Sequence, residues 1–238
     1  MPSAYPTGSE IERIRAEYAR RGREIPQDFY SWSRPVNQFF HCQTLRACVA
    51  ALVREALFPL TGKTIVDIGC GSGEWLTEFI QWGARCADVG GIDLRPDKIE
   101  EARKRLPEAN LHTGDARRLP FPSNSADLVS QFTVFTSILE PHFKKAVAAE
   151  MLRVLKPGGL ILWYDFRFNN PSNSSVRGIK SEEIRTLFPG CRIHLRRVTL
   201  APPVARFVVP ITWIGALLLE KIPILRTHYL GAIRKTAI

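Results

Sequence analysis

A glycine-rich turn follows the acid Asp67 in the stretch "VDIGCGSGEW", where it could bring bare backbone against a ligand. Gly69, Gly71 and Gly73 lie between an apolar run and a helical pattern. Glycine lets a ligand approach the backbone closely, and a helix N-terminus favours negative charge. The spacing is GxGxG, and Glu74 stands where the third glycine of a dinucleotide-binding GxGxxG turn would fall. The stretch therefore argues against a dinucleotide, and no Gly-Lys-Ser/Thr follows to form a phosphate-binding loop.

Acidic residues also end the next two apolar runs. Asp93 comes 26 residues after Asp67, at a position where a carboxylate can accept hydrogen bonds from two ribose hydroxyls. Asp115 ends "LHTGD", where a carboxylate can accept a hydrogen bond from an exocyclic amine. Singly, each acid could be a helix cap or a turn residue. Together they predict a site for a nucleoside that lacks phosphate and carries positive charge.

Apolar runs of strand length alternate with helical patterns from residue 63 onward, and this alternation must position the three acids. It predicts strands at 64–69, 88–94, 110–115, 126–132 and 160–166, with helices at 73–83, 96–106 and 144–155. Such alternation is typical of right-handed βαβ units on a parallel sheet. The carboxyl ends of the strands would then lie at one edge of the sheet, where ligands bind in such folds.

The flanking segments differ from this core. Residues before 61 show helical patterns and an aromatic patch but no strand. After a polar loop, the pattern predicts a helix at 182–188, a sheet-edge strand at 191–198, a helix in the apolar run 207–219 and a last strand at 227–235.

Composition places the chain among ordinary globular proteins. It has 238 residues, 45% of them hydrophobic, and a formal net charge of +10 that favours acidic partners. The first residues lack the apolar core of a signal peptide, and the run 207–219 is too short to span a bilayer. We therefore expect a cytoplasmic protein, with attachment to the periphery of a membrane as an open alternative. The five cysteines include no CxxC pair, which indicates reduced thiols and no zinc site.

Four motifs carry a resemblance to a known family. "VDIGCGSG", "GIDL", "GDARRLPFPSNSADLV" and "MLRVLKPGGLILWYD" resemble the class I S-adenosylmethionine-dependent methyltransferases, in their small-molecule branch, over Thr61–Phe166. The resemblance implies an α/β fold with a Rossmann-like, doubly wound, seven-stranded sheet that is mostly parallel and has one antiparallel strand. It implies an N-terminal helical arm or lid at 1–60 and a methyltransferase domain at 61–238, with 166–225 as an acceptor-side elaboration.

The same resemblance assigns the donor site. S-adenosylmethionine would be the cofactor and S-adenosylhomocysteine the product, with no metal. Asp67 and the turn would hold the methionine portion, Asp93 the ribose and Leu94 the adenine face; Asp115 and the Ala116 amide would bind the adenine edge, and Gln131 would lie beside the sulfonium. The residues expected to bind the cofactor are Asp67, Gly69, Cys70, Gly71, Gly73, Asp93, Leu94, Asp115, Ala116 and Gln131.

Acceptor binding is expected after the fourth and fifth strands. Tyr164, Arg167 and Asn170 suit a polar, oxygen-rich acceptor, and Tyr30 in the aromatic patch is expected to act as a lid. These loop residues could equally satisfy their own backbone through side-chain turns. The donor is already activated, so a general base is needed only for a poorly ionised hydroxyl or amine. Asp165 and His142 are the candidates for such a base.

The predicted function is O-methylation of a small-molecule or sugar acceptor. A lipid or quinone methyltransferase at a membrane surface is the alternative, because the segment 202–235 mixes apolar and basic residues. The positive charge also suggests RNA methylation, but the fourth strand ends in "SQFT", without the motifs of base methylation, and nucleic acid is not expected as a partner. A binding module without catalysis is the remaining alternative. The sequence indicates no oligomeric state.

Overall fold

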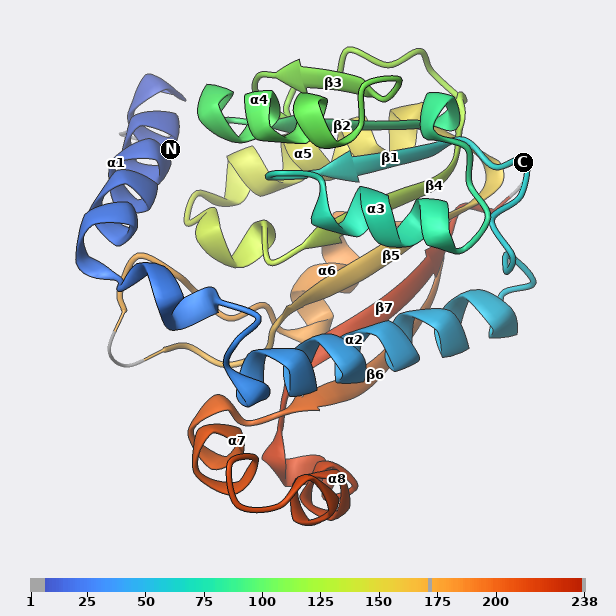
Figure 1. The fold of residues 1–238 in the computed structure, drawn as a ribbon. Helices are drawn as coiled ribbons and strands as arrows, with labels where there is room; N and C mark the ends of the chain where they lie inside the picture. Colours follow the sequence, from blue (N-terminus) through green and yellow to red (C-terminus); the bar gives the residue numbers. More distant parts are fainter. Residues whose placement is uncertain (1–6, 171–172, 237–238) are drawn as a thin grey trace.

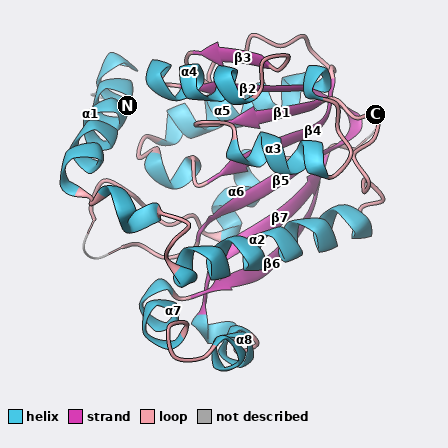
Figure 2. Ribbon diagram, in the orientation of Figure 1, coloured by secondary structure: helices cyan, strands magenta, loops and turns pink. Residues whose placement is uncertain are grey.

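A seven-stranded sheet forms the centre of the molecule in the computed structural model, which describes residues 7–170 and 173–236 (Figures 1 and 2). The order of its strands is β3-β2-β1-β4-β5-β7-β6. β7 is antiparallel to both β5 and β6, and the other neighbours are parallel. The strands are β1 (Ile65–Ile68), β2 (Val89–Asp93), β3 (Asn110–Thr113), β4 (Ala126–Phe132), β5 (Leu155–Phe166), β6 (Arg192–Leu200) and β7 (Arg226–Arg234). The predicted fold class, including the closing antiparallel strand, is therefore confirmed.

Helices cover both faces of this sheet. The α-helices are α1 (Thr7–Glu24), α2 (Pro35–Arg54), α3 (Glu74–Gln81), α4 (Pro96–Arg105), α5 (Pro141–Val154), α6 (Ser181–Leu187), α7 (Pro202–Val208) and α8 (Trp213–Glu220). The short 3-10 helices are η1 (Gln27–Tyr30), η2 (Cys86–Asp88), η3 (Phe135–Ser137) and η4 (Pro223–Leu225). α2, α3 and α4 pack on one face of the sheet, and α5 and α6 pack on the other.

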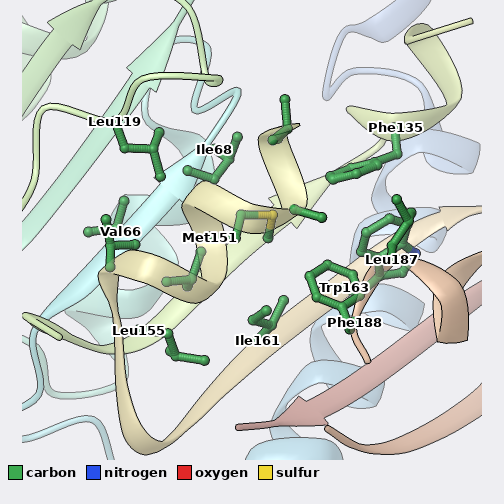
Figure 3. Close-up of a cluster of buried hydrophobic side chains, with 14 of the residues drawn as sticks. Val66, Ile68, Leu119, Phe135, Met151, Leu155, Ile161, Trp163, Leu187 and Phe188 are labelled. Atoms are coloured by element: carbon green, nitrogen blue, oxygen red, sulfur yellow. The ribbon is translucent and has the colours of Figure 1, made fainter. Parts of the chain in front are cut away.

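The two faces follow from the strand period of two residues. In β5, Leu162 and Tyr164 join the core under α2 and α3, whereas Ile161 and Trp163 join the core under α5 and α6. Figure 3 shows this second core, in which Trp163 lies near Phe188. Trp163 is fully buried, and burial of a side chain of this size stabilises the fold by roughly 2–3 kcal/mol. The alternation of side chains along a strand therefore decides on which face of the sheet a residue near a strand end lies.

α1 lies at the side of the sheet toward which the arrowheads of the parallel strands point (Figure 1). The carboxylate of Glu10 accepts a hydrogen bond from the Leu139 N–H at 2.6 Å, and the Arg13 guanidinium donates to the Ser137 carbonyl at 2.6 Å. Glu10 and Arg13 also pair with each other at 2.7 Å. These contacts attach α1 to the loop between β4 and α5, across the edge where the ligand was expected.

The connection between β6 and β7 differs from the sequence-based prediction of one helix over 207–219. The apolar run is divided between α7 and α8, with Pro210 in the break. Proline lacks the N–H that a continuous helix needs. The Thr212 hydroxyl accepts a hydrogen bond from the Gly215 N–H at 3.1 Å and starts the second helix afresh.

Candidate functional site

The glycine turn between β1 and α3 has a backbone that side chains would disturb. Gly69, Gly71 and Gly73 have φ values of +69°, +51° and +79°, in the left-handed region that glycine adopts readily. A Cβ added at Gly69 would lie 2.5 Å from Cγ2 of Val134, which is closer than atoms can approach. The Gly69 N–H donates to the Ile92 carbonyl at 2.8 Å and fixes the turn against β2. The turn is thus glycine-rich because its backbone is left-handed at three positions and packs tightly against Val134 at one of them.

Asp93 fastens the turn to the next strand. Its carboxylate accepts hydrogen bonds from the Gly71 N–H at 3.0 Å and the Arg95 N–H at 2.9 Å. Burial raises the pKa of Asp93, although these two backbone donors oppose the shift. A carboxylate held in this way has remaining lone pairs that can accept hydrogen bonds from a ligand.

Asp67 is a second buried carboxylate at this edge. The Ser130 hydroxyl donates to it at 2.6 Å, and no basic side chain in the described parts of the chain forms an ion pair with it. Burial raises the pKa of Asp67 to about 7, and the nearby charge of Asp93 adds to the shift. A buried carboxylate without a cation is stabilised by a ligand that brings positive charge.

A narrow cavity of about 90 Å³ lies along the ends of β1, β2 and β3. Asp93, Leu94, Asp115 and Ala116 line it from the sheet side. Asp115 is itself paired with Arg117 at 2.7 Å. Two apolar side chains of α1, Ile14 and Tyr18, line the cavity from the other side.

A wide cavity of about 780 Å³ continues from the narrow one. Both are lined by Tyr18, Phe132 and Ser137, so these residues mark the junction between them. Aromatic side chains from several segments of the chain line the wide cavity, among them Phe29, Trp32, Phe40, Trp75, Phe166 and Phe168. Its arginines are Arg20, Arg21, Arg177 and Arg206. The arrangement can hold an apolar or aromatic ligand body together with an anionic or oxygen-rich group.

Comparison with known proteins agrees with this geometry. A family model described as a methyltransferase domain matches residues 65–159. Over these residues the resemblance to the class I S-adenosylmethionine-dependent methyltransferases is therefore confirmed.

Individual relatives are similar to the chain over part of its length. A phthiotriol/phenolphthiotriol dimycocerosates methyltransferase from Mycobacterium leprae is 33% identical in an alignment of 135 residues that covers 52% of this chain and 48% of the relative. A demethylmenaquinone methyltransferase from Renibacterium salmoninarum is 31% identical over 138 residues, or 58% of this chain and 55% of the relative. The chain therefore spans about half the length of these curated relatives. The structure of phosphoethanolamine N-methyltransferase 1 from Haemonchus contortus matches 98% of this chain and 51% of its own, with a TM-score of 0.63 and 17% identity.

Most of the residues predicted to bind the cofactor gather at the narrow cavity. Gly69, Asp93, Leu94, Asp115 and Ala116 line it directly. The Gly71 N–H binds Asp93, Gly73 precedes the first turn of α3, and Asp67 lies buried behind the turn, as described above. The assignment of these residues to the cofactor remains a prediction.

Cys70 and Gln131 lie in the interior instead of at the cavities. The Cys70 thiol packs against β2 at Gly91, and burial raises its pKa, which keeps it protonated and unreactive. Gln131 is fully buried; its carbonyl oxygen accepts from the Val134 N–H at 3.0 Å and its amide donates to the Tyr164 carbonyl at 3.3 Å. Gln131 therefore holds the loop after β4, while the next residue, Phe132, reaches the cavity junction.

Neither residue predicted as a general base lines a cavity. Asp165 follows Tyr164 in β5, so strand alternation directs its side chain to the opposite face of the sheet from the wide cavity. There its carboxylate accepts from the Phe135 and Thr136 N–H groups at 3.0 and 3.2 Å. His142 is exposed in the first turn of α5. The structure thus gives Asp165 a role in holding η3 and leaves His142 outside both cavities.

The predicted acceptor residues divide similarly. Tyr164 and Asn170 line the wide cavity, and the Tyr164 hydroxyl is hydrogen-bonded to that of Thr199 at 2.8 Å. Burial raises the pKa of Tyr164 to about 12, so this hydroxyl stays neutral. Arg167 does not line the cavity; its guanidinium lies 4.2 Å from the centre of the Phe168 ring and donates to the Arg226 carbonyl. The side chain of Tyr30 lies outside the described part of the structure.

Sequence reasoning missed a histidine–carboxylate pair in the wide cavity. His41 of α2 lines this cavity, and its Nε2 lies 2.9 Å from Oε1 of Glu78 in α3. A carboxylate only accepts hydrogen bonds, so the Nε2–H donates to Glu78, and in the neutral ring the lone pair is then on Nδ1. The His41 ring is enclosed by Trp32 and Trp75 at centroid distances of 4.6 and 5.9 Å. The two partners are 37 residues apart on different helices, so no local pattern indicates the pair.

His228, which also lines the wide cavity, makes the stability of the folded protein depend on pH. Burial lowers its pKa from 6.5 to about 3. Between these values the unfolded chain binds more protons than the folded one, so the free energy of unfolding decreases as the pH falls through this window. We expect the wild type to lose on the order of 3 kcal/mol more than a His228→Gln variant when the pH falls from neutral to about 4. Urea denaturation of both proteins across this range measures the difference.

The comparison with the variant is needed because Asp165 acts in the opposite direction. Burial raises the pKa of Asp165 to about 7, so its protonation in the folded state stabilises the protein at acidic pH and this stabilisation is lost as the pH rises. Parallel curves for the wild type and His228→Gln would show that His228 is not buried in its neutral form.

Proposed function

We propose that this protein transfers the methyl group of S-adenosylmethionine to an oxygen of a small acceptor that binds in the wide cavity. The observation that carries the proposal is the junction of the two cavities at Tyr18, Phe132 and Ser137. A ligand along the strand ends and a second ligand in the wide cavity would meet there, beneath α1. Alignment of two reactants and exclusion of water are the main tasks of an enzyme whose donor is already activated.

The residues along the sheet edge fit S-adenosylmethionine. The backbone of Gly69 and the carboxylates of Asp93 and Asp115 line the narrow cavity. Asp67 is a buried carboxylate that a cationic donor would stabilise. When bound, S-adenosylmethionine supplies a sulfonium-linked methyl group that an acceptor oxygen can take in one displacement, and it leaves as S-adenosylhomocysteine.

The chain's own part in the reaction falls to His41 and Glu78. The free Nδ1 of His41 would accept the proton of the acceptor hydroxyl as the new oxygen–carbon bond forms, and Glu78 would stabilise the resulting imidazolium through Nε2. Tyr18 and Ile25 of the N-terminal arm, which line the wide cavity, would exclude water from the reacting groups.

The lining of the wide cavity favours an acceptor with an apolar or aromatic body. Trp75 and Phe132 stack at 3.7 Å on the wall, and Phe29, Phe40 and Phe166 add further rings. This supports the lipid or quinone alternative from the sequence, and two relatives are named for dimycocerosates and demethylmenaquinone. A sugar or glycan acceptor remains a second candidate, because Asn170 and Arg177 also line the cavity.

Methyl-labelled S-adenosylmethionine tests the proposal directly. The purified protein would be incubated with the labelled donor and an extract of its host, and products would be separated into organic-soluble, water-soluble, glycan and nucleic-acid fractions. We expect label in the organic-soluble fraction, lost with His41→Gln. Label in the glycan fraction would select the second candidate. Label in nucleic acid alone, or no label while calorimetry shows donor binding, would contradict the proposal.

A further inference from the structure

The connection between β6 and β7 is far longer than the sheet requires. Neighbouring antiparallel strands can be joined by a turn of about two residues. Here residues 201–225 form α7, α8 and η4 between the two strands. Figures 1 and 2 show this segment beyond β6, projecting from the end of the sheet. The insertion is therefore not needed to join the two strands.

One side of the insertion is buried and the other is apolar and exposed. Ala205, Val209 and Ala216 pack with Phe39 of α2 in a small core. The large apolar residues of the insertion that face solvent define what we call the outer face, and they are Phe207, Ile211, Trp213, Ile214, Leu218, Ile222 and Ile224. Phe207 is 74% exposed, Ile214 73% and Ile224 79%. Side chains of this size are normally exposed together only where a surface binds something.

The charges around the outer face are mostly positive. Residues 196–226 include five basic side chains and one acid. The acid, Glu220, is already paired with Arg46 of α2 at 2.7 Å. A second copy of the chain docked on this face would bring like charges together, which is unfavourable. An apolar surface bordered by Arg and Lys instead suits the headgroup region of an anionic bilayer.

The insertion also borders the wide cavity. Pro202 and Arg206 of α7 line that cavity, and the Arg206 guanidinium lies 4.8 Å from the centre of the Phe29 ring. Phe207, the next residue, is exposed on the outer face. In the described parts of the chain no helix has the length and apolarity to cross a bilayer, so contact with lipid would be made at its surface.

We propose that residues 202–225 dock this protein on the surface of an anionic lipid bilayer. Phe207, Ile214 and Leu218 enter the boundary between headgroups and acyl chains, and Arg206 and Lys221 face the anionic headgroups. Docking places the mouth of the wide cavity against the membrane. Entry of an acceptor from the bilayer rests on the proposed function, whereas the docking itself does not.

Flotation with vesicles tests the docking. The wild-type chain would be mixed with vesicles of phosphatidylcholine alone or of phosphatidylcholine with phosphatidylglycerol. We expect about tenfold stronger binding to the anionic vesicles, weakened by salt. An Ile214→Asp/Leu218→Asp variant should bind at least about tenfold more weakly, because two charges would enter the apolar boundary. Val53→Asp is the matched control, since Val53 is 56% exposed on α2, outside the insertion.

Three results would overturn the inference: no binding of the wild type to anionic vesicles, equal binding of the double variant, or a dimer in sedimentation velocity that the double variant abolishes. The dimer would assign the outer face to a second copy of the chain. Calorimetry with S-adenosylhomocysteine checks that the double variant is folded. Retained donor binding with lost flotation affects only the docking site, whereas absent donor binding in the wild type would contradict the proposed function instead.

Discussion

Replacing Asp93 with alanine should weaken the binding of S-adenosylmethionine by about 100-fold. The carboxylate of Asp93 lies at the narrow cavity and is held by the Gly71 and Arg95 N–H groups. Hydrogen bonds to a charged group contribute about 1.5–3 kcal/mol each, and the loss of two to a ligand's hydroxyls corresponds to about 3 kcal/mol or more. The substitution also releases the N–H of Gly71 and loosens the turn. Titration calorimetry with S-adenosylhomocysteine measures the affinity.

Asp97→Ala is the matched control for this prediction. Asp97 lies four residues further on, in the first turn of α4, where it pairs with Arg95 but lines neither cavity. The affinity of the Asp97→Ala variant for the donor should stay within about twofold of that of the wild type, since an exposed ion pair contributes little to the stability of the fold. Asp93→Asn keeps one acceptor oxygen and should give an intermediate loss. An unchanged donor affinity in Asp93→Ala would contradict the prediction that Asp93 binds the ribose of the donor.

The glycine turn and the strand-end acids could be predicted from sequence because they are local features of consecutive parallel strands. Each of Asp67, Asp93 and Asp115 ends or follows an apolar run, and the carboxyl ends of such strands meet at one edge. The parallel βαβ part of the sheet was predicted in the same way, from alternating strands and helices. For the turn and the acids, the residues close in sequence are enough to predict where the side chains lie.

The direction of a side chain at that edge was harder to predict. Tyr164 and Asp165 are neighbours in sequence, yet one lines the wide cavity and the other holds η3 on the opposite face. A shift of one residue in the register reverses such an assignment. Gln131 and Phe132 show the same effect in β4, where Phe132, not Gln131, reaches the junction of the cavities.

Contacts between distant segments could not be predicted from sequence at all. The pairing of His41 with Glu78 depends on how α2 and α3 pack side by side on the sheet. The attachment of α1 through Glu10 and Arg13 joins segments more than 120 residues apart. Such contacts are set by the assembled core and leave no periodic signal in the chain.

Replacing His41 with glutamine should lower kcat by about 100-fold or more, while donor affinity stays near that of the wild type. The reason is that His41 lines the wide cavity, whereas the narrow cavity is lined without it. Glu78→Gln keeps the ring in place but loses the charge that stabilises the imidazolium, so a smaller loss of about tenfold is expected. Both are measured as kcat and as donor affinity by calorimetry.

Variants of two further histidines serve as controls for the His41→Gln experiment. His194 is exposed on the edge strand β6, and His194→Gln should leave kcat unchanged. His142→Gln separates the geometry from the sequence-based prediction, because a loss of activity there with none in His41→Gln would restore His142 as the base. If kcat is unaffected by either substitution, the acceptor reacts without losing its proton to the protein, as an already ionised oxygen would. The aromatic wall would then be the main contribution of the protein to the reaction, through alignment and exclusion of water.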